Sequence, residues 1–139
     1  MIVTILIMSA VGALALAVAW LAQRQRRPSP TSTTGEPPAQ LDRTDFRSPD
    51  ARWLIAVFTS ASCASCERFW NELASYESAT TVAQNIEVAA DPDLHRKYRI
   101  DSVPTAVIAG ADGIVRHAVV GPLAPEDRRD IGAILAGDG

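Results

Sequence analysis

Residues 53–66 read WLIAVFTSASCASC. The first six residues are a continuous apolar run, which is typical of a strand buried on both faces of a sheet. Beyond it, three large apolar side chains recur at helical spacing between residues 63 and 76: Phe69, Trp70 and Leu73. The charged residues among them can face water. The pattern predicts a central strand followed by a helix, with two cysteines at the junction.

Cys63 and Cys66 stand where the predicted strand ends and the helix begins. We expect Cys63 at the amino terminus of the helix, where the helix dipole and free N–H groups stabilise a thiolate. Cys66 lies one turn further on, close enough for the two sulfurs to meet. Cys63 is therefore the candidate nucleophile, and Cys66 the candidate resolving residue that releases the substrate. A CxxC pair at a strand-to-helix junction is typical of a redox motif.

Zinc binding and inert buried thiols are the alternative interpretations of this pair. A structural zinc ion normally has four protein ligands, and only His95 and His117 could complete such a set. They fall on a predicted helix and a predicted strand, 22 residues apart, so we expect no metal. His95 is expected to be a solvated helix residue between Asp91 and Arg99, and His117 an exposed or half-buried strand residue.

The remaining elements are predicted from periodicity and turn residues. In chain order they are a strand over 86–90, a helix from Pro92, strands over 105–109 and 114–120, and a helix over 125–136. Asp91 can cap the helix that begins at Pro92, and Gly110–Gly113 has the composition of a hairpin turn. The order βαβαββα predicts an α/β domain, a mixed sheet flanked by helices on both faces.

Two blocks of the sequence together resemble the thioredoxin domain: CASC after the buried strand, and KYRIDSVPT at residues 97–105. The resemblance in order and spacing covers about residues 51–136. It implies a thioredoxin-like fold in which Pro104 follows a cis peptide bond and packs beside the cysteines. It also implies that Val103, Pro104 and Thr105 shape a substrate groove, where a strand edge pairs with an extended peptide.

Several residues depart from thioredoxin itself. Ser62 stands in place of a Trp, Ala64–Ser65 separate the cysteines, and Val57 falls where the family has a buried Asp. Glu67 and Glu87 place negative charge near the helix start and on the neighbouring strand, which opposes thiolate formation. We therefore expect a less readily ionised nucleophile, and a redox potential that cannot be copied from thioredoxin.

The amino-terminal residues 2–22 are uncharged and almost wholly apolar. Twenty helical residues span about 30 Å, the thickness of the hydrocarbon layer of a bilayer. A signal peptide carries cations before its apolar region, whereas here three arginines follow it: Arg24, Arg26 and Arg27. The small residues Ala17–Ala19 nevertheless resemble a cleavage site. We interpret residues 1–22 as an uncleaved transmembrane anchor that contacts the membrane through residues 2–22.

The arginines also bear on the orientation of this single-pass protein. Cationic residues beside a spanning helix are preferentially retained in the cytoplasm, which places the carboxy-terminal domain on the cytoplasmic side. The extracytoplasmic side is the alternative. Residues 23–50 hold five of the nine prolines and are interpreted as a Pro/Ser/Thr-rich linker. Within it, Leu41 and Phe46 are exceptions, and residues 42–46 are predicted to form a short helix at the domain edge.

Residues 51–139 are interpreted as the thioredoxin-like domain. From residue 42 onward there are 10 basic and 15 acidic residues, a net charge of −5, which argues against a nucleic-acid partner. We expect a membrane-tethered thiol–disulfide oxidoreductase that acts on protein thiol or disulfide substrates and exchanges electrons with an unidentified donor or acceptor. No metal or organic cofactor is implied. The alternative is a non-catalytic docking or assembly module with the same fold.

Overall fold

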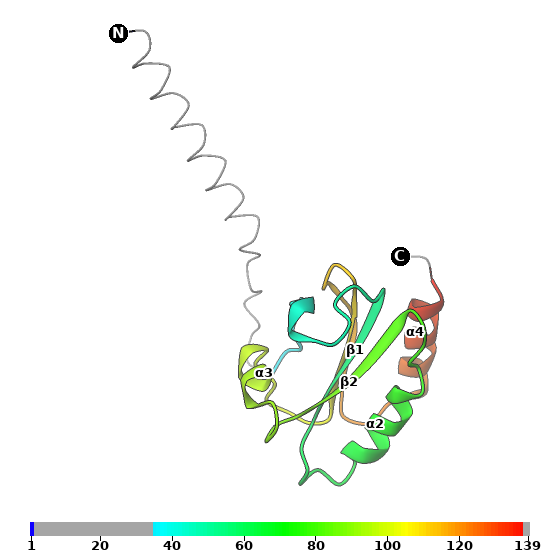
Figure 1. Cartoon of the computed structure of the whole chain (residues 1–139). Coiled ribbons are helices and arrows are strands. Elements are labelled where there is room, and N and C mark those ends of the chain that lie inside the picture. The colour runs from blue at the N-terminus through cyan, green and yellow to red at the C-terminus, as the bar shows by residue number, and fades with distance from the viewer. Residues whose placement is uncertain (2–34, 138–139) are drawn as a thin grey trace.

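The computed structural model describes residue 1 and residues 35–137 of the chain (Figure 1). The elements follow in the order η1 (Arg43–Asp45), β1 (Trp53–Thr59), α2 (Cys66–Ala74), β2 (Thr81–Glu87), α3 (Pro92–Lys97), β3 (Thr105–Gly110), β4 (Val115–Val120) and α4 (Pro125–Ala136). The sheet has the strand order β2-β1-β3-β4. β1 pairs with β2 in parallel and with β3 antiparallel, and β3 pairs with β4 antiparallel. The predicted mixed sheet is confirmed.

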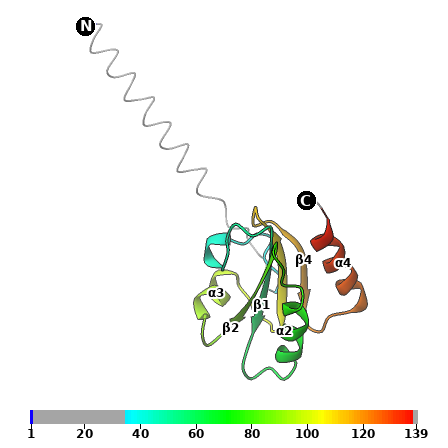
Figure 2. The same ribbon diagram turned by 45° about the vertical axis from the view of Figure 1, so that its right-hand side comes forward.

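The strand β1 is central, and all seven of its residues are buried. Its side chains alternate between two apolar clusters, because successive residues of a strand point to opposite faces. On one face Leu54 and Phe58 meet the amino-terminal segment and α3. On the other face Ile55 packs in the cluster that α2 and α4 complete with Leu73 and Ile131. Figure 2 shows α2 and α4 on one side of the sheet and α3 on the other.

The strand β2 differs from its predicted position. It spans Thr81–Glu87, not residues 86–90. Residues 88–90 form a turn in which the amides of Ala90 and Asp91 donate to the carbonyl oxygen of Glu87. The apolar residues of that turn suggested a strand, whereas the real strand is at the sheet edge, where Gln84 and Asn85 are tolerated.

The amino-terminal segment before residue 51 is part of the core. Leu41 and Phe46 are 1% and 5% exposed, and the predicted short helix is a single 3₁₀ turn, η1. The amide of Leu41 donates to the carbonyl oxygen of Gly113 at 2.8 Å. Gly113 has φ +76°, and a Cβ there would lie 2.2 Å from the oxygen of Leu41, so the close approach requires glycine. The packed core therefore begins before the predicted domain boundary.

The predicted anchor, residues 2–22, and the first part of the predicted linker lie outside the described residues. Among the residues that are described, no helix is long and apolar enough to cross a bilayer.

Candidate redox site at the carboxyl end of β1

The candidate site lies at one end of the sheet, where an end of each of the four strands is found. Thr59 at the end of β1 is in register with Glu87 at the end of β2. Thr105 at the start of β3 is in register with Phe58 on one side and with Val120, the last residue of β4, on the other. The loop that leaves β1 and the segment that enters β3 therefore emerge at the same edge.

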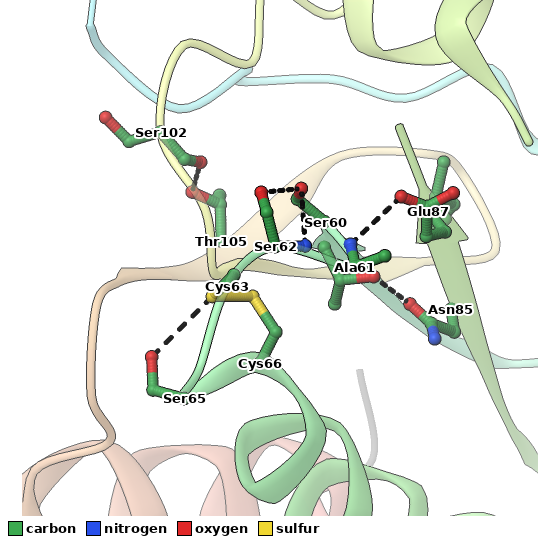
Figure 3. The surroundings of a disulfide bond; sticks show 12 residues. Ser60, Ala61, Ser62, Cys63, Ser65, Cys66, Asn85, Glu87, Ser102 and Thr105 are labelled. Carbon is green, nitrogen blue, oxygen red and sulfur yellow. Dashed lines mark hydrogen bonds between the residues drawn. A yellow bond between two sulfur atoms is a disulfide. The ribbon is translucent and has the colours of Figure 1, made fainter. Parts of the chain in front are cut away.

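Cys63 and Cys66 form a disulfide in this loop, with their Cα atoms 5.4 Å apart (Figure 3). The helix α2 begins at Cys66, with Ser65 as the N-cap, so Cys63 precedes the helix and is not its first residue as predicted. Two turns intervene, because the amide of Cys63 donates to the carbonyl oxygen of Ser60, and that of Cys66 to the carbonyl oxygen of Cys63. The hydroxyl of Ser60 also accepts from the amide of Ser62, a local bond that competes with helix formation.

The two cysteines of the disulfide differ in exposure. Cys66 is 3% exposed, whereas Cys63 is half-buried. The Sγ atom of Cys63 lies 3.7 Å from the Oγ atom of Ser65. An approaching thiol or thiolate can therefore reach Cys63, while Cys66 is buried.

The segment before β3 carries the predicted cis peptide bond, between Val103 and Pro104. Pro104 and Thr105 are buried, and Val103 is half-buried. The carbonyl oxygen of Pro104 accepts from the amide of Gly121 at 2.9 Å. The hydroxyl of Thr105 donates to the carbonyl oxygen of Ser102 at 2.8 Å. Figure 3 includes Ser102 and Thr105 among the surroundings of the disulfide.

Glu87 connects the cysteine loop to the end of β2, a role that sequence reasoning missed. One carboxylate oxygen, Oε1, accepts from the amide of Ala61 at 3.1 Å. The other, Oε2, accepts from the amides of Ala89 at 2.9 Å and Ala90 at 3.1 Å. From the sequence, Glu87 could be recognised only as a negative charge near the cysteines. The groups that donate to its carboxylate are main-chain amides in two loops, which the sequence does not reveal.

The two histidines are not brought to the cysteines. His95 is 6% exposed, and not solvated as predicted. Its ring stands edge-on to Phe58, and its Nε2 atom lies 2.9 Å from the carbonyl oxygen of Ile86, because α3 packs with this side chain toward the sheet. His117 is half-buried, with Nε2 3.0 Å from Oδ1 of Asp127. In the described part of the chain, no group of three or more His, Cys, Asp or Glu residues is placed to hold a metal ion.

Comparison with known families places this fold and its cysteine pair in context. The family model described as a thioredoxin-like domain matches residues 40–132. The chain belongs to the thioredoxin-like domain family. The match begins where the packed core begins, close to Leu41. A thioredoxin-like domain with Cys63 and Cys66 at disulfide distance suggests a redox-type function.

Solved structures show the same fold. A mutant thioredoxin from Halobacterium salinarum NRC-1 is 22% identical with a TM-score of 0.56, and the match covers 78% of this chain and 98% of that one. A designed protein is 24% identical with a TM-score of 0.51, covering 63% and 85%. A malarial protein is 13% identical with a TM-score of 0.52, covering 62% and 99%. A search of curated proteins found no match.

Proposed function

We propose that this thioredoxin-like domain is a thiol–disulfide oxidoreductase for protein substrates, in which Cys63 attacks and Cys66 resolves. The observation that carries the proposal is the unequal exposure of a bonded pair. Cys66 is 3% exposed and Cys63 is half-buried, so a substrate sulfur can reach only Cys63 directly. Exchange requires access of the attacking thiolate to one sulfur of a disulfide, and the pair satisfies this on one side.

The reaction follows from these positions. In the reduced domain, the thiolate of Cys63 attacks one sulfur of a substrate disulfide, and the other substrate sulfur leaves as a thiolate that takes up a proton. Cys66 then loses its proton and attacks the Sγ atom of Cys63. The Cys63–Cys66 disulfide forms, and the second substrate thiol is released. Two electrons pass from the domain to the substrate, and the reverse sequence oxidises a substrate dithiol.

The segment Val103–Thr105 is proposed to bind the substrate chain beside the disulfide. Within residues 35–137, no backbone hydrogen bond occupies the N–H or carbonyl of Val103. The neighbouring carbonyl of Pro104 is already bonded to Gly121. An extended peptide can therefore pair with Val103 in the manner of an added strand, which would hold its sulfur next to Cys63.

Residues 2–22 are proposed to tether the domain to a membrane. Their length and apolar composition, and the arginines behind them, support a single-pass anchor with the domain in the cytoplasm. On that side, cellular thiol pools would keep the dithiol reduced and make the protein a reductase. On the other side, the protein would take part in the maturation of exported proteins.

Trapping of the mixed disulfide tests the proposal. The full chain in detergent is mixed with a disulfide-bonded peptide, and the products are identified by mass. Cys66→Ser is expected to accumulate a peptide disulfide-bonded to Cys63, because the resolving thiol is missing. Cys63→Ser is expected to accumulate none and to lose catalysed peptide reduction. If Cys63→Ser reduced the peptide as fast as the parent protein, the assignment of the nucleophile would be wrong. If neither Cys63→Ser nor the parent protein reacted with the peptide, a docking module would explain the fold better.

A further inference from the structure

We infer that Glu87 is a positioning residue for the thiol–disulfide exchange, an inference that rests on the proposed oxidoreductase function. Its carboxylate holds the loop that carries Cys63 against the end of β2. Glu87 is in register with Thr59, the last residue of β1, so its side chain stands next to the point where the cysteine loop leaves the sheet. The contact with Ala61 crosses from one strand end to the next (Figure 3).

The contact with Ala61 bears directly on Cys63. Ala61 lies inside the turn that is closed when the amide of Cys63 donates to the carbonyl oxygen of Ser60 at 3.1 Å. A fixed Ala61 amide therefore fixes the turn whose last residue is the nucleophile. A second hydrogen bond to β2 is close to this turn, since the hydroxyl of Thr59 donates to Oδ1 of Asn85 at 2.6 Å.

The other carboxylate oxygen of Glu87, Oε2, binds the turn that follows β2. Its partners are the amides of Ala89 and Ala90, in the turn that follows β2. The main-chain oxygen of Glu87 accepts from Ala90 and Asp91 in the same turn. The carboxylate therefore joins two loops, one after each parallel strand, and neither loop can move without breaking a charge-assisted hydrogen bond.

Glu87 can affect the thiol–disulfide exchange in two ways, through its charge and through the position of the cysteine loop. As a bare charge it would only oppose the thiolate of Cys63. Three N–H groups point at its carboxylate, however, and their partial positive charges offset much of that repulsion. Its larger effect is geometric. A held loop keeps Cys63 within reach of Cys66 and raises the effective concentration of one sulfur at the other, which favours ring closure to the disulfide.

The test compares Glu87→Ala, Glu87→Gln and Glu67→Gln in the full chain. Glu67→Gln is the matched control, because Glu67 directly follows Cys66 and is exposed. Two quantities are measured: the equilibrium constant between dithiol and disulfide in glutathione buffers, and the pH dependence of Cys63 alkylation. Glu87→Ala is expected to shift the equilibrium about 5- to 10-fold toward the dithiol, the effect of losing one or two hydrogen bonds.

Rescue by the conservative variant distinguishes position from charge. Glu87→Gln keeps an oxygen that can accept from Ala61, so it is expected to recover at least half of the shift on a logarithmic scale. The equilibrium constant between dithiol and disulfide in Glu67→Gln is expected to stay within about twofold of that of the parent protein. If both Glu87 variants shifted the equilibrium and the alkylation profile equally, Glu87 would act by charge alone and the inference would be overturned.

Three further outcomes are decisive. If Glu87→Ala does not fold, Glu87→Asp takes its place, because it keeps the charge but is one methylene too short to hold the amide of Ala61 in the same way. A larger shift toward the dithiol for Glu87→Asp than for Glu87→Gln upholds the positioning role, and equal shifts or the reverse order overturn it. If the parent protein itself shows no reversible exchange, the proposed function fails. If the parent exchanges normally and Glu87→Ala matches it, only the role of Glu87 fails.

Discussion

Phe58, the last but one residue of β1, pairs in register with Thr105, the first residue of β3. This pairing brings together two motifs that are far apart in the chain. The cysteine loop leaves the sheet one residue after Phe58, and the Val103–Pro104 segment enters it directly before Thr105. The candidate nucleophile and the proposed peptide-binding segment thus share one sheet edge, a geometry that suits attack on an extended substrate.

The hydroxyl of Thr105 is predicted to matter for peptide substrates. It donates to the carbonyl oxygen of Ser102 at 2.8 Å and closes the turn that contains Val103. Thr105→Val keeps the shape of the side chain but removes the donor, which is worth about 1 kcal/mol or roughly a fivefold change. We expect peptide reduction to slow by about that factor, while Thr105→Ser retains the parent rate.

Glutathione disulfide provides the control for Thr105, because such a small substrate does not need the proposed groove. Its rate of reduction by Thr105→Val is expected to match that of the parent protein. Equal losses with the peptide and with glutathione disulfide would contradict a role in peptide binding and indicate a general loss of structure.

Tyr98 is predicted to make the stability of the protein sensitive to alkaline pH. Burial, reinforced by the hydrogen bond to Asp45, raises the pKa of Tyr98 well above its ordinary value of 10.0. The unfolded chain therefore loses this proton first, so stability is fully present below about pH 10 and falls as the pH rises further. Urea unfolding of the oxidised protein between pH 8 and 12 should show this decline, and Tyr98→Phe should flatten it.

The other tyrosine, Tyr76, supplies the comparison for Tyr98. Tyr76→Phe is expected to keep the alkaline decline of the parent protein. At pH 7, Tyr98→Phe should cost about 1–2 kcal/mol, because its hydroxyl also accepts from the amide of Asp42 at 3.0 Å. A decline that persisted unchanged in Tyr98→Phe would show that another group is responsible.

His95 is predicted to contribute to stability and not to catalysis. His95→Ala removes an aromatic contact with Phe58 and leaves the carbonyl oxygen of Ile86 without its side-chain partner. We expect a loss of about 2–4 kcal/mol in the free energy of unfolding. His117→Ala, which removes a half-buried pair with Asp127, should cost at most about 1 kcal/mol. Equal costs in urea unfolding would contradict the structural role of His95.

The ion pair between Arg47 and Glu77 is predicted to protect the open edge of β2. The guanidinium of Arg47 donates to the carbonyl oxygen of Ala83, and the amide of Ala83 donates to Oε2 of Glu77 at 3.2 Å. The two outward main-chain groups of this edge residue are thereby occupied. Unprotected edge strands pair with other chains, so the double variant Arg47→Ala, Glu77→Ala should self-associate with rising concentration.

Sedimentation velocity measures this association. The matched control is Asp93→Ala, Arg96→Ala, which removes an exposed ion pair on α3 and should leave the oligomeric state unchanged. An Arg47 and Glu77 double variant that sedimented like the parent at all concentrations would show that the edge needs no such protection.

Short-range patterns predicted the parts of this fold that depend on local residues. The apolar run of β1 and the cysteine pair after it were indicated by consecutive residues, whereas the cis peptide bond at Pro104 was implied by the resemblance to the thioredoxin domain. The strand β2 was misplaced because Gln84 and Asn85 interrupt its apolar pattern at the sheet edge. The turn after it supplied a better apolar run than the strand itself.

Features that depend on tertiary packing could not be predicted in this way. The burial of His95 depends on which side of α3 faces the sheet, and a six-residue helix has too few turns to show that periodicity. Leu41 belongs to the core only because Gly113 lets the two backbones approach. The contacts of Glu87 are with main-chain amides of two separate loops, which no residue type reveals.

A redox titration of the full chain in detergent tests the account most directly. The protein is equilibrated with glutathione and dithiothreitol buffers, and the thiols of Cys63 and Cys66 are followed by mass. We predict one reversible two-electron transition, with a potential of about −270 mV for a reductase or about −120 mV for an oxidant. A Cys63–Cys66 pair that does not exchange reversibly with either buffer would contradict the oxidoreductase account.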